Sequence, residues 1–161
     1  MFDRVAYGRE LEPLLRQAAA YAYSHLGNRS DAEDAVQQAA LQAWTRIEQY
    51  DTTRPFKGWW FAILRNCCFD ILRQRRAARS DSLEGVDPPD TRTTEAFDWE
   101  CLEAGLRRLS PTHQAILRLK YYGGLSYEAL AEALSIPKGT VMSRLHLARK
   151  ALAEQLRKEE R

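Results

Sequence analysis

Residues 126–150, SYEALAEALSIPKGTVMSRLHLARK, contain the clearest structural signal in the chain. Ser126 is a preferred helix N-cap residue, and apolar side chains follow it at helical spacing as far as Leu134. The residues Ser135-Ile136-Pro137 then predict a tight turn, and a long amphipathic helix begins at Lys138. Two helices joined by so short a turn have the dimensions of a helix-turn-helix, whose second helix enters the major groove of DNA. An ordinary helical hairpin is the alternative.

The second of these helices has one apolar side and one polar side. Val141 and Leu145 are predicted to pack against Leu130, Ala131 and Leu134 of the first helix. The opposite side would then face DNA and contact base edges and phosphates. The residues predicted on that side are Lys138, Thr140, Met142, Ser143, Arg144, His146 and Arg149.

The segment before the helix-turn-helix predicts two more helices and a linker. Apolar residues from Phe97 to Leu109 predict a short helix, and Ser110-Pro111 opens another that runs to about Tyr122. Between about Ala77 and Thr94 the apolar pattern disappears, and Ser, Asp, Gly and two prolines take its place. This composition is typical of a flexible linker and predicts a domain boundary.

The N-terminal half predicts three helices. The first spans Leu11 to Leu26, and a capping box of Ser30 and Glu33 opens the second, whose apolar stripe continues to Ile47. Residues 50–57 predict a loop, and helical periodicity resumes at Phe56. Because no segment alternates with the period of a strand, we expect an all-α protein. The expected domains are residues 1–78 and 95–161, each a small helical domain, joined by an acidic linker over residues 79–94.

Charge divides along the chain in the same way. The 161 residues carry a formal net charge of only +2, but residues 1–80 sum to +3, residues 81–105 to −7 and residues 106–161 to +6. Two basic modules on either side of an acidic connector are typical of nucleic-acid binding, although solvated helical surfaces can carry similar charges. The charged N-terminus and the lack of a long apolar run predict a cytoplasmic protein without membrane insertion.

A second cluster of candidate DNA-binding residues combines aromatic rings with cations. The run Arg54-Pro55-Phe56-Lys57-Gly58-Trp59-Trp60 is followed on the same helix by several basic residues. Exposed rings beside a basic track can stack unpaired bases while cations neutralise the backbone. The alternative is that these aromatic residues fill a core, which we expect for Trp60, Ile63 and Leu64.

Sites for catalysis or metals are not predicted. The three histidines and the scattered carboxylates form no motif for a nucleophile, a phosphate loop or a metal, so we expect neither enzymatic activity nor a cofactor. Cys67, Cys68 and Cys101 have neither disulfide nor zinc spacing. They are interpreted as structural thiols, with redox sensing as the alternative.

Together, these segments resemble the extracytoplasmic-function (ECF) sigma factors. Residues 31–37 (DAEDAVQ) and 59–66 (WWFAILRN) are similar to region two of that family, and residues 124–131 (GLSYEALA) and 136–145 (IPKGTVMSRL) to region four. The resemblance implies two helical domains that bind core RNA polymerase, through the clamp helices of its largest subunit and its flap, and promoter DNA. An anti-sigma factor is implied as a further partner.

The resemblance also implies residue roles. Region four would use the helix-turn-helix side defined above for the −35 element, and region two would bind polymerase through Asp31, Glu33, Asp34, Gln37 and Gln38. Region two would also capture the −10 element with Asp51, Arg54, Phe56, Lys57, Trp59, Arg65, Asn66, Arg73 and Arg76. A helix-turn-helix repressor or activator is the competing hypothesis, and it predicts operator binding without polymerase.

Overall fold

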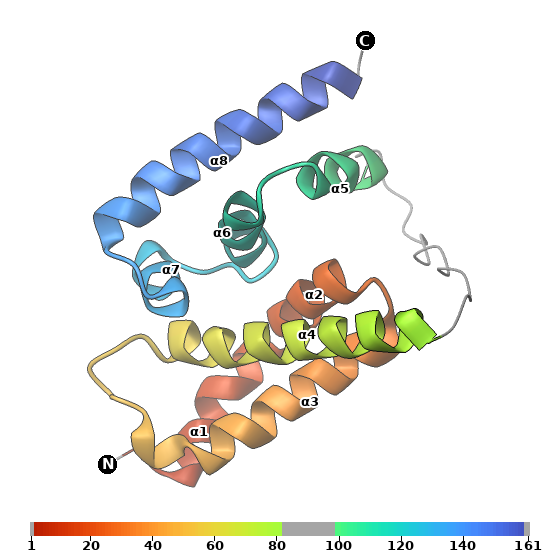
Figure 1. Ribbon diagram of the computed structural model, residues 1–161. Coiled ribbons are helices and arrows are strands. Elements are labelled where there is room, and N and C mark those ends of the chain that lie inside the picture. Colours follow the sequence, from red (N-terminus) through yellow and green to blue (C-terminus); the bar gives the residue numbers. More distant parts are fainter. Residues whose placement is uncertain (1, 82–98, 160–161) are drawn as a thin grey trace.

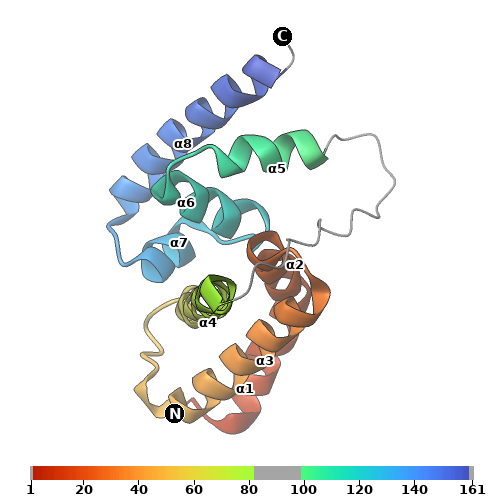
Figure 2. The same ribbon diagram turned by 45° about the vertical axis from the view of Figure 1, so that its right-hand side comes forward.

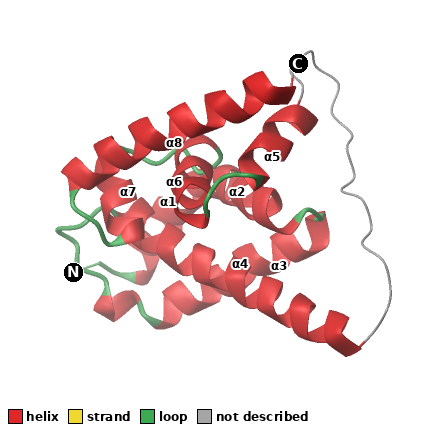
Figure 3. Cartoon of the chain, turned by 45° about the horizontal axis from the view of Figure 1, so that its top comes forward, coloured by secondary structure: helices red, strands yellow, loops and turns green. Residues whose placement is uncertain are grey.

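The computed structural model describes residues 2–81 and 99–159, and all regular structure in these ranges is helical (Figures 1 and 3). This confirms the predicted all-α class. Ten helical segments occur in the described ranges: α1 (Arg4–Leu11), the 3-10 turn η1 (Glu12–Leu14), α2 (Leu15–Leu26), α3 (Arg29–Thr45), the 3-10 turn η2 (Ile47–Gln49), α4 (Phe56–Asp81), α5 (Trp99–Arg107), α6 (Pro111–Tyr121), α7 (Tyr127–Leu134) and α8 (Lys138–Glu159).

Helices α1 to α4 are here called the N-terminal unit. In this unit α3 and α4 pack against each other, and α2 packs against both. The side of α3 that faces the core consists of alanines, and the small side chains allow close approach of the neighbouring helices. Helix α4 fills the space with large side chains, among which Trp60 and Phe61 are fully buried. The hydroxyl of Tyr7 donates to the carbonyl oxygen of Ala40 at 2.7 Å and joins α1 to α3.

At the junction between α2 and α3, the N-cap of α3 differs from the predicted one. Gly27 ends α2 in the left-handed conformation, with φ of 73°, which glycine adopts without steric cost. The N-cap of α3 is Asn28, whose side-chain oxygen accepts from the backbone N–H of Asp31 at 2.8 Å. The predicted capping box of Ser30 and Glu33 is wrong, because Ser30 already lies within the helix.

The predicted ends of two other helices also change. An additional helix, α1, precedes the predicted first helix, and the side chain of Asp3 caps it by accepting from the N–H groups of Val5 and Ala6. The short turn η1, with Pro13 near its start, separates α1 from α2. Helix α4 continues to Asp81, so the first residues assigned to the linker are helical. The rest of that linker, and Phe97, lie outside the described residues.

Helices α5 to α8, here called the C-terminal unit, contain the helix-turn-helix. Ser110 caps α6 with Pro111 in its first turn, and Ser126 caps α7 by accepting from the N–H of Ala129 at 3.1 Å, as predicted. Leu130 of α7 and Val141 and Leu145 of α8 are buried together, again as predicted. Helices α6 and α5 pack along the same side of α8 as α7, towards its C-terminal end (Figure 1).

The two units pack directly against each other. Helix α7 lies on the N-terminal half of α4, and α6 lies near α2, as the views in Figures 1 and 2 both show. The buried side chains of the two units therefore form one continuous cluster rather than two separate cores. In Figure 2, α4 is seen nearly end-on between α7 and α3.

Candidate nucleic-acid interface

The N-terminal half of α8 presents the predicted −35 residues to solvent. Ser135 ends α7 in the left-handed conformation, with φ of 53°, and this turn directs α8 away from α7. Met142 is apolar and 54% exposed. Lys138, Ser143, His146 and Arg149 are exposed, and Thr140 and Arg144 are half-buried. These seven residues are called the recognition face.

Two cations of the recognition face already have partners within the C-terminal unit. The ammonium of Lys138 pairs with the carboxylate of Glu128 at the start of α7, and the ion pair lowers the pKa of Glu128. The guanidinium of Arg149 donates to the hydroxyl of Tyr121 at 2.7 Å. Both contacts are at the surface, so phosphates can replace them at little cost.

The loop before α4 and the first turn of α4 contain five of the nine predicted −10 residues, among which Phe56 is only 7% exposed. Its ring packs against those of Phe2, Tyr50 and Trp59, with centroids 5.5 to 5.8 Å away. The assignment of Phe56 to DNA contact therefore does not fit this structure, because the ring helps to form the core. Trp59 is half-buried at the edge of the same cluster.

Residues of the C-terminal unit contact two of the predicted −10 cations. The ammonium of Lys57 donates to the carbonyl oxygen of Gly124 at 3.0 Å and to the side-chain oxygen of Gln17 at 2.5 Å. Desolvation, and the charge of Lys120 nearby, lower the pKa of Lys57. The guanidinium of Arg54 lies 3.5 Å from the carboxylate of Glu132 on α7.

The remaining predicted −10 residues lie in the loop or along α4. The carboxylate of Asp51 accepts from the N–H and the hydroxyl of Thr53, which shapes the loop and lowers the pKa of Asp51. Asn66, Arg73 and Arg76 are exposed, whereas Arg65 is half-buried with its guanidinium 5.0 Å from the ring centroid of Phe69. Arg73 also pairs with Asp70.

The predicted polymerase-binding residues occupy the outer side of α3, with one exception. Glu33, Asp34, Gln37 and Gln38 are exposed. Asp31 is held inward by Arg75 of α4, whose Nε donates to its carboxylate at 2.8 Å and whose Nη2 donates to the same carboxylate. The remaining nitrogen, Nη1, donates to the carbonyl oxygen of Leu26. Burial opposes ionisation of Asp31, but the bonds from Arg75 and Asn28 outweigh it and lower the pKa of Asp31.

Two exposed apolar residues on α3 escaped the sequence analysis. Leu41 is 68% exposed, and Trp44, which the periodicity assigned to the buried stripe, is 37% exposed. The guanidinium of Arg4 lies 4.8 Å from the ring centroid of Trp44. The signal for Leu41 was available, because it is a large apolar residue outside the alanine stripe. The outer face of α3 is defined here as Glu33, Asp34, Gln37, Gln38 and Leu41.

Two residues in the contact between the units also escaped the sequence analysis. Gln17 of α2 accepts from Lys57, and Arg118 of α6 is a buried cation with a partner in α2. Gln17 lies on the polar side of a helix, and Arg118 looks like an ordinary residue of a basic module. Sequence pattern alone gives no signal for either role.

Cys67 and Cys68 are unreactive in this fold, and the described residues contain no metal-binding arrangement. Cys67 and Cys68 are fully buried, and burial raises the pKa of Cys68 to about 12, which suppresses the reactive thiolate. Across residues 2–81 and 99–159, no group of His, Cys, Asp and Glu is arranged to hold a metal ion. None of the helices in these same ranges is long and apolar enough to cross a membrane.

Comparison with known families matches each unit separately. The model of Sigma-70 region 2 matches residues 11–78, and that of Sigma-70 region 4 matches residues 99–152. The ECF RNA polymerase sigma factor SigL of Mycobacterium tuberculosis is 37% identical over 141 residues, covering 82% of this chain and 78% of SigL. SigW of Bacillus subtilis is 30% identical over 151 residues, covering 84% of this chain and 80% of SigW.

Solved structures resemble the arrangement of the whole chain. The sigma factor RpoE in complex with the anti-sigma factor NepR from Bartonella quintana has a TM-score of 0.73 and 30% identity, covering 94% of this chain and 96% of RpoE. CnrH in complex with the cytosolic domain of CnrY has a TM-score of 0.70 and 25% identity, covering 96% and 89% of the two chains. From these matches and the helix-turn-helix geometry, the chain belongs to the ECF RNA polymerase sigma factors.

Proposed function

We propose that this sigma factor binds core RNA polymerase through the outer face of α3 and directs it to promoters in the cytoplasm. The N-terminal unit, with a domain over residues 1–78, would capture the −10 element. The C-terminal unit, with a domain over residues 95–161, would bind the −35 element. The observation that carries this proposal is the presence, in one chain, of a helix-turn-helix with a free recognition face and a second helical unit with its own basic helix, α4.

The outer face of α3 supports the part of the proposal that concerns polymerase. Its acidic and amide side chains are exposed, and Leu41, at the C-terminal end of this face, adds an apolar contact that a partner protein would bury. Protein interfaces combine apolar contacts with polar side chains in this way. Since Asp31 is already paired with Arg75, we assign it a structural role that holds the start of α3 against α4.

The promoter contacts divide between duplex and single strand. On the recognition face, Met142 suits the methyl group of thymine, while Ser143 and His146 provide groups that hydrogen-bond to base edges. On α4, Asn66, Arg73 and Arg76 form an exposed track for a DNA strand. Asp51 and the loop around it would take up a flipped base, and Trp59 lies beside that loop.

An anti-sigma factor is part of the proposal. The sigma factor RpoE, which has a similar structure, was solved with the anti-sigma factor NepR, and the similar CnrH was solved with the cytosolic domain of CnrY. Both resemble this chain over more than nine-tenths of its length, so the arrangement of the two units is similar in all three. We infer that a partner of the same class binds this chain in that arrangement.

Run-off transcription with purified core polymerase tests the proposed function. We expect discrete transcripts from a genomic fragment library only when the chain is added. The variant Asp34→Arg should abolish co-purification with core and the transcripts, whereas Glu48→Arg, an equal charge change on exposed η2, should preserve both. Specific duplex binding by the chain alone, with no effect on core polymerase, would instead favour the repressor or activator hypothesis.

A further inference from the structure

The contact between α4 and α7 depends on the absence of one side chain. A β-carbon added at Gly58 of α4 would lie 2.5 Å from the carbonyl oxygen of Ala129 and 2.7 Å from the β-carbon of Glu132, both on α7. Real β-carbons do not approach backbone atoms so closely, so any other residue at this position would push the helices apart. Gly58 therefore permits a fit between the two units that its own helix does not require.

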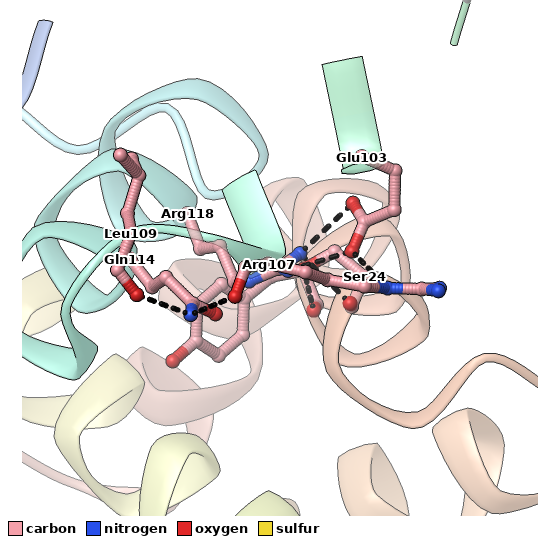
Figure 4. A network of polar contacts seen from close by, with 7 residues as sticks. Ser24, Glu103, Arg107, Leu109, Gln114 and Arg118 are labelled. Carbon is pink, nitrogen blue, oxygen red and sulfur yellow. Dashed lines mark hydrogen bonds and ion pairs between the residues drawn. The ribbon is translucent and has the colours of Figure 1, made fainter. Parts of the chain in front are cut away.

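A buried arginine also joins the two units, at the separate contact between α6 and α2. Arg118 of α6 is only 4% exposed, and its guanidinium pairs with the carboxylate of Glu103 at 2.6 Å within the C-terminal unit. The same guanidinium donates to the carbonyl oxygen of Ser24, near the end of α2, at 2.8 Å (Figure 4). A buried cation is stable only when its donors are satisfied, and here the N-terminal unit supplies one of the acceptors.

The contact between the units also occupies residues that we assign to the −10 element. Lys57 donates to the carbonyl oxygen of Gly124, and Arg54 faces Glu132. A DNA backbone at Lys57 would have to displace Gly124, and a phosphate near Arg54 would meet the negative charge of Glu132. The C-terminal unit and a DNA strand therefore compete for the first turn of α4 and the loop before it.

We propose that the chain inhibits itself. The C-terminal unit packs on α4 at Gly58, is held there by the hydrogen bond from Arg118 to the N-terminal unit, and covers the −10 surface until the two units separate. This inference rests on the proposed function of Arg54 and Lys57. No partner is needed for the block, because every group named belongs to this chain. An anti-sigma factor would strengthen a closed state that already exists, and core polymerase would favour the open one.

The substitution Gly58→Ala tests the proposal in the full-length chain. Alanine favours helix more than glycine does, so α4 itself should become more stable, while the added methyl group disfavours the closed state. Overpacking costs of the usual size predict a rise of about 5- to 100-fold in the ratio of open to closed molecules. Gly8→Ala is the matched control, because Gly8 also lies in a helix but has nothing within 4 Å of the added carbon.

Two measurements test whether the units separate and whether the −10 surface becomes accessible. Small-angle X-ray scattering should give the wild type and Gly8→Ala a radius of gyration near the ~15 Å of a compact chain of this length, and Gly58→Ala a clearly larger value. Fluorescence anisotropy with a labelled single-stranded 20-mer of mixed sequence should show tighter binding by Gly58→Ala than by the wild type or Gly8→Ala. Glu132→Arg, which repels Arg54, should act in the same direction, and Glu154→Arg on exposed α8 should not.

The outcomes separate this proposal from the proposed function. An extended wild type, or Gly58→Ala that opens without binding the oligonucleotide more tightly, overturns self-inhibition even if transcription with core polymerase succeeds. An inactive wild type in run-off transcription overturns the sigma function, whereas the scattering result stands independently, because it requires no polymerase. Equal compactness of all variants would show that Gly58 does not control the contact, and would also overturn the proposal.

Discussion

The two surfaces assigned to DNA differ in how accessible they are. The recognition face of α8 is open to solvent and has only surface contacts, whereas the first turn of α4 is covered by α7 and by the turn at Gly124. A chain built this way can approach duplex DNA with one unit while the other is blocked. The difference indicates that access to the −10 element, rather than to the −35 element, is the controlled step.

The largest effect is expected at Phe56, on the covered side. Because the ring is buried among four other aromatic rings, Phe56→Ala should lower the free energy of unfolding by about 3–5 kcal/mol. Urea unfolding measures this loss, with Met142→Ala as the exposed control. Unchanged stability combined with lost −10 binding would return Phe56 to the DNA contacts.

On the open side, Met142→Asp should reduce transcription from the sigma-dependent promoter by about 10- to 100-fold, because a carboxylate would face the bases and phosphates of the groove. The melting temperature should stay the same, since the side chain is 54% exposed. Ala153→Asp, on the exposed second half of α8, should leave transcription near the wild-type level. If both variants lose transcription equally, the recognition face is wrongly placed.

A pH effect is expected on the covered side. Burial, with Arg118 of α6 and Arg65 of α4 nearby, lowers the pKa of His25 from 6.5 to about 3. The unfolded chain therefore binds a proton that the folded chain does not, so stability is complete above pH 6.5 and falls as the pH drops towards 3. At pH 5 the loss is about 2 kcal/mol by linkage.

Urea unfolding at pH 7.5, 6 and 5 tests this pH effect, with the variant His25→Gln as the reference. The difference in pH dependence between the two proteins isolates His25. The pKa of Asp31 is also lowered, so its ionisation also links stability to pH. Because its ordinary pKa is 3.8, that contribution is lost mainly below about pH 4, outside the range from pH 7.5 to 5 that is measured. Parallel curves for the two proteins would exclude the imidazole as the cause.

The smallest effect concerns the ion pair between α3 and α4. Asp31→Asn removes the charge that Arg75 neutralises and should cost about 1 kcal/mol of stability. Core polymerase should still bind, because Asp31 is not part of the outer face of α3. A pull-down with core polymerase checks this against Asp34→Asn, which should weaken binding without changing stability.

Local signals predicted much of the fold because the deciding interactions lie within a few residues. Ser110, Ser126 and Gly27 cap or end helices as their residue types suggest, and Leu130, Val141 and Leu145 form the predicted contact. Near Ser30 the same reasoning failed, because Asn28 offered a competing cap two residues earlier. Helix α4 continues to Asp81 through charged residues, for which apolar periodicity gives no signal.

Contacts between the units could not be predicted in this way. Arg118 and Ser24 are 94 residues apart in sequence, and Lys57 and Gly124 are 67 apart. Neither pair belongs to a motif, and the basic side chains involved have the usual appearance of residues that bind DNA. The sequence therefore predicted where the cations lie along the chain, but not that some of them already have partners in the folded protein.

Position 58 could also be used to engineer the basal activity of the sigma factor. Helix α7 can pack on α4 at this position only when residue 58 has no β-carbon. Side chains of increasing size there, such as Ala, Ser and Val, would therefore raise the basal activity of the sigma factor in steps. The −10 and −35 contacts would stay intact, so promoter choice would not change. In a synthetic gene circuit, the choice of residue 58 would then set the level of transcription in the absence of an inducing signal.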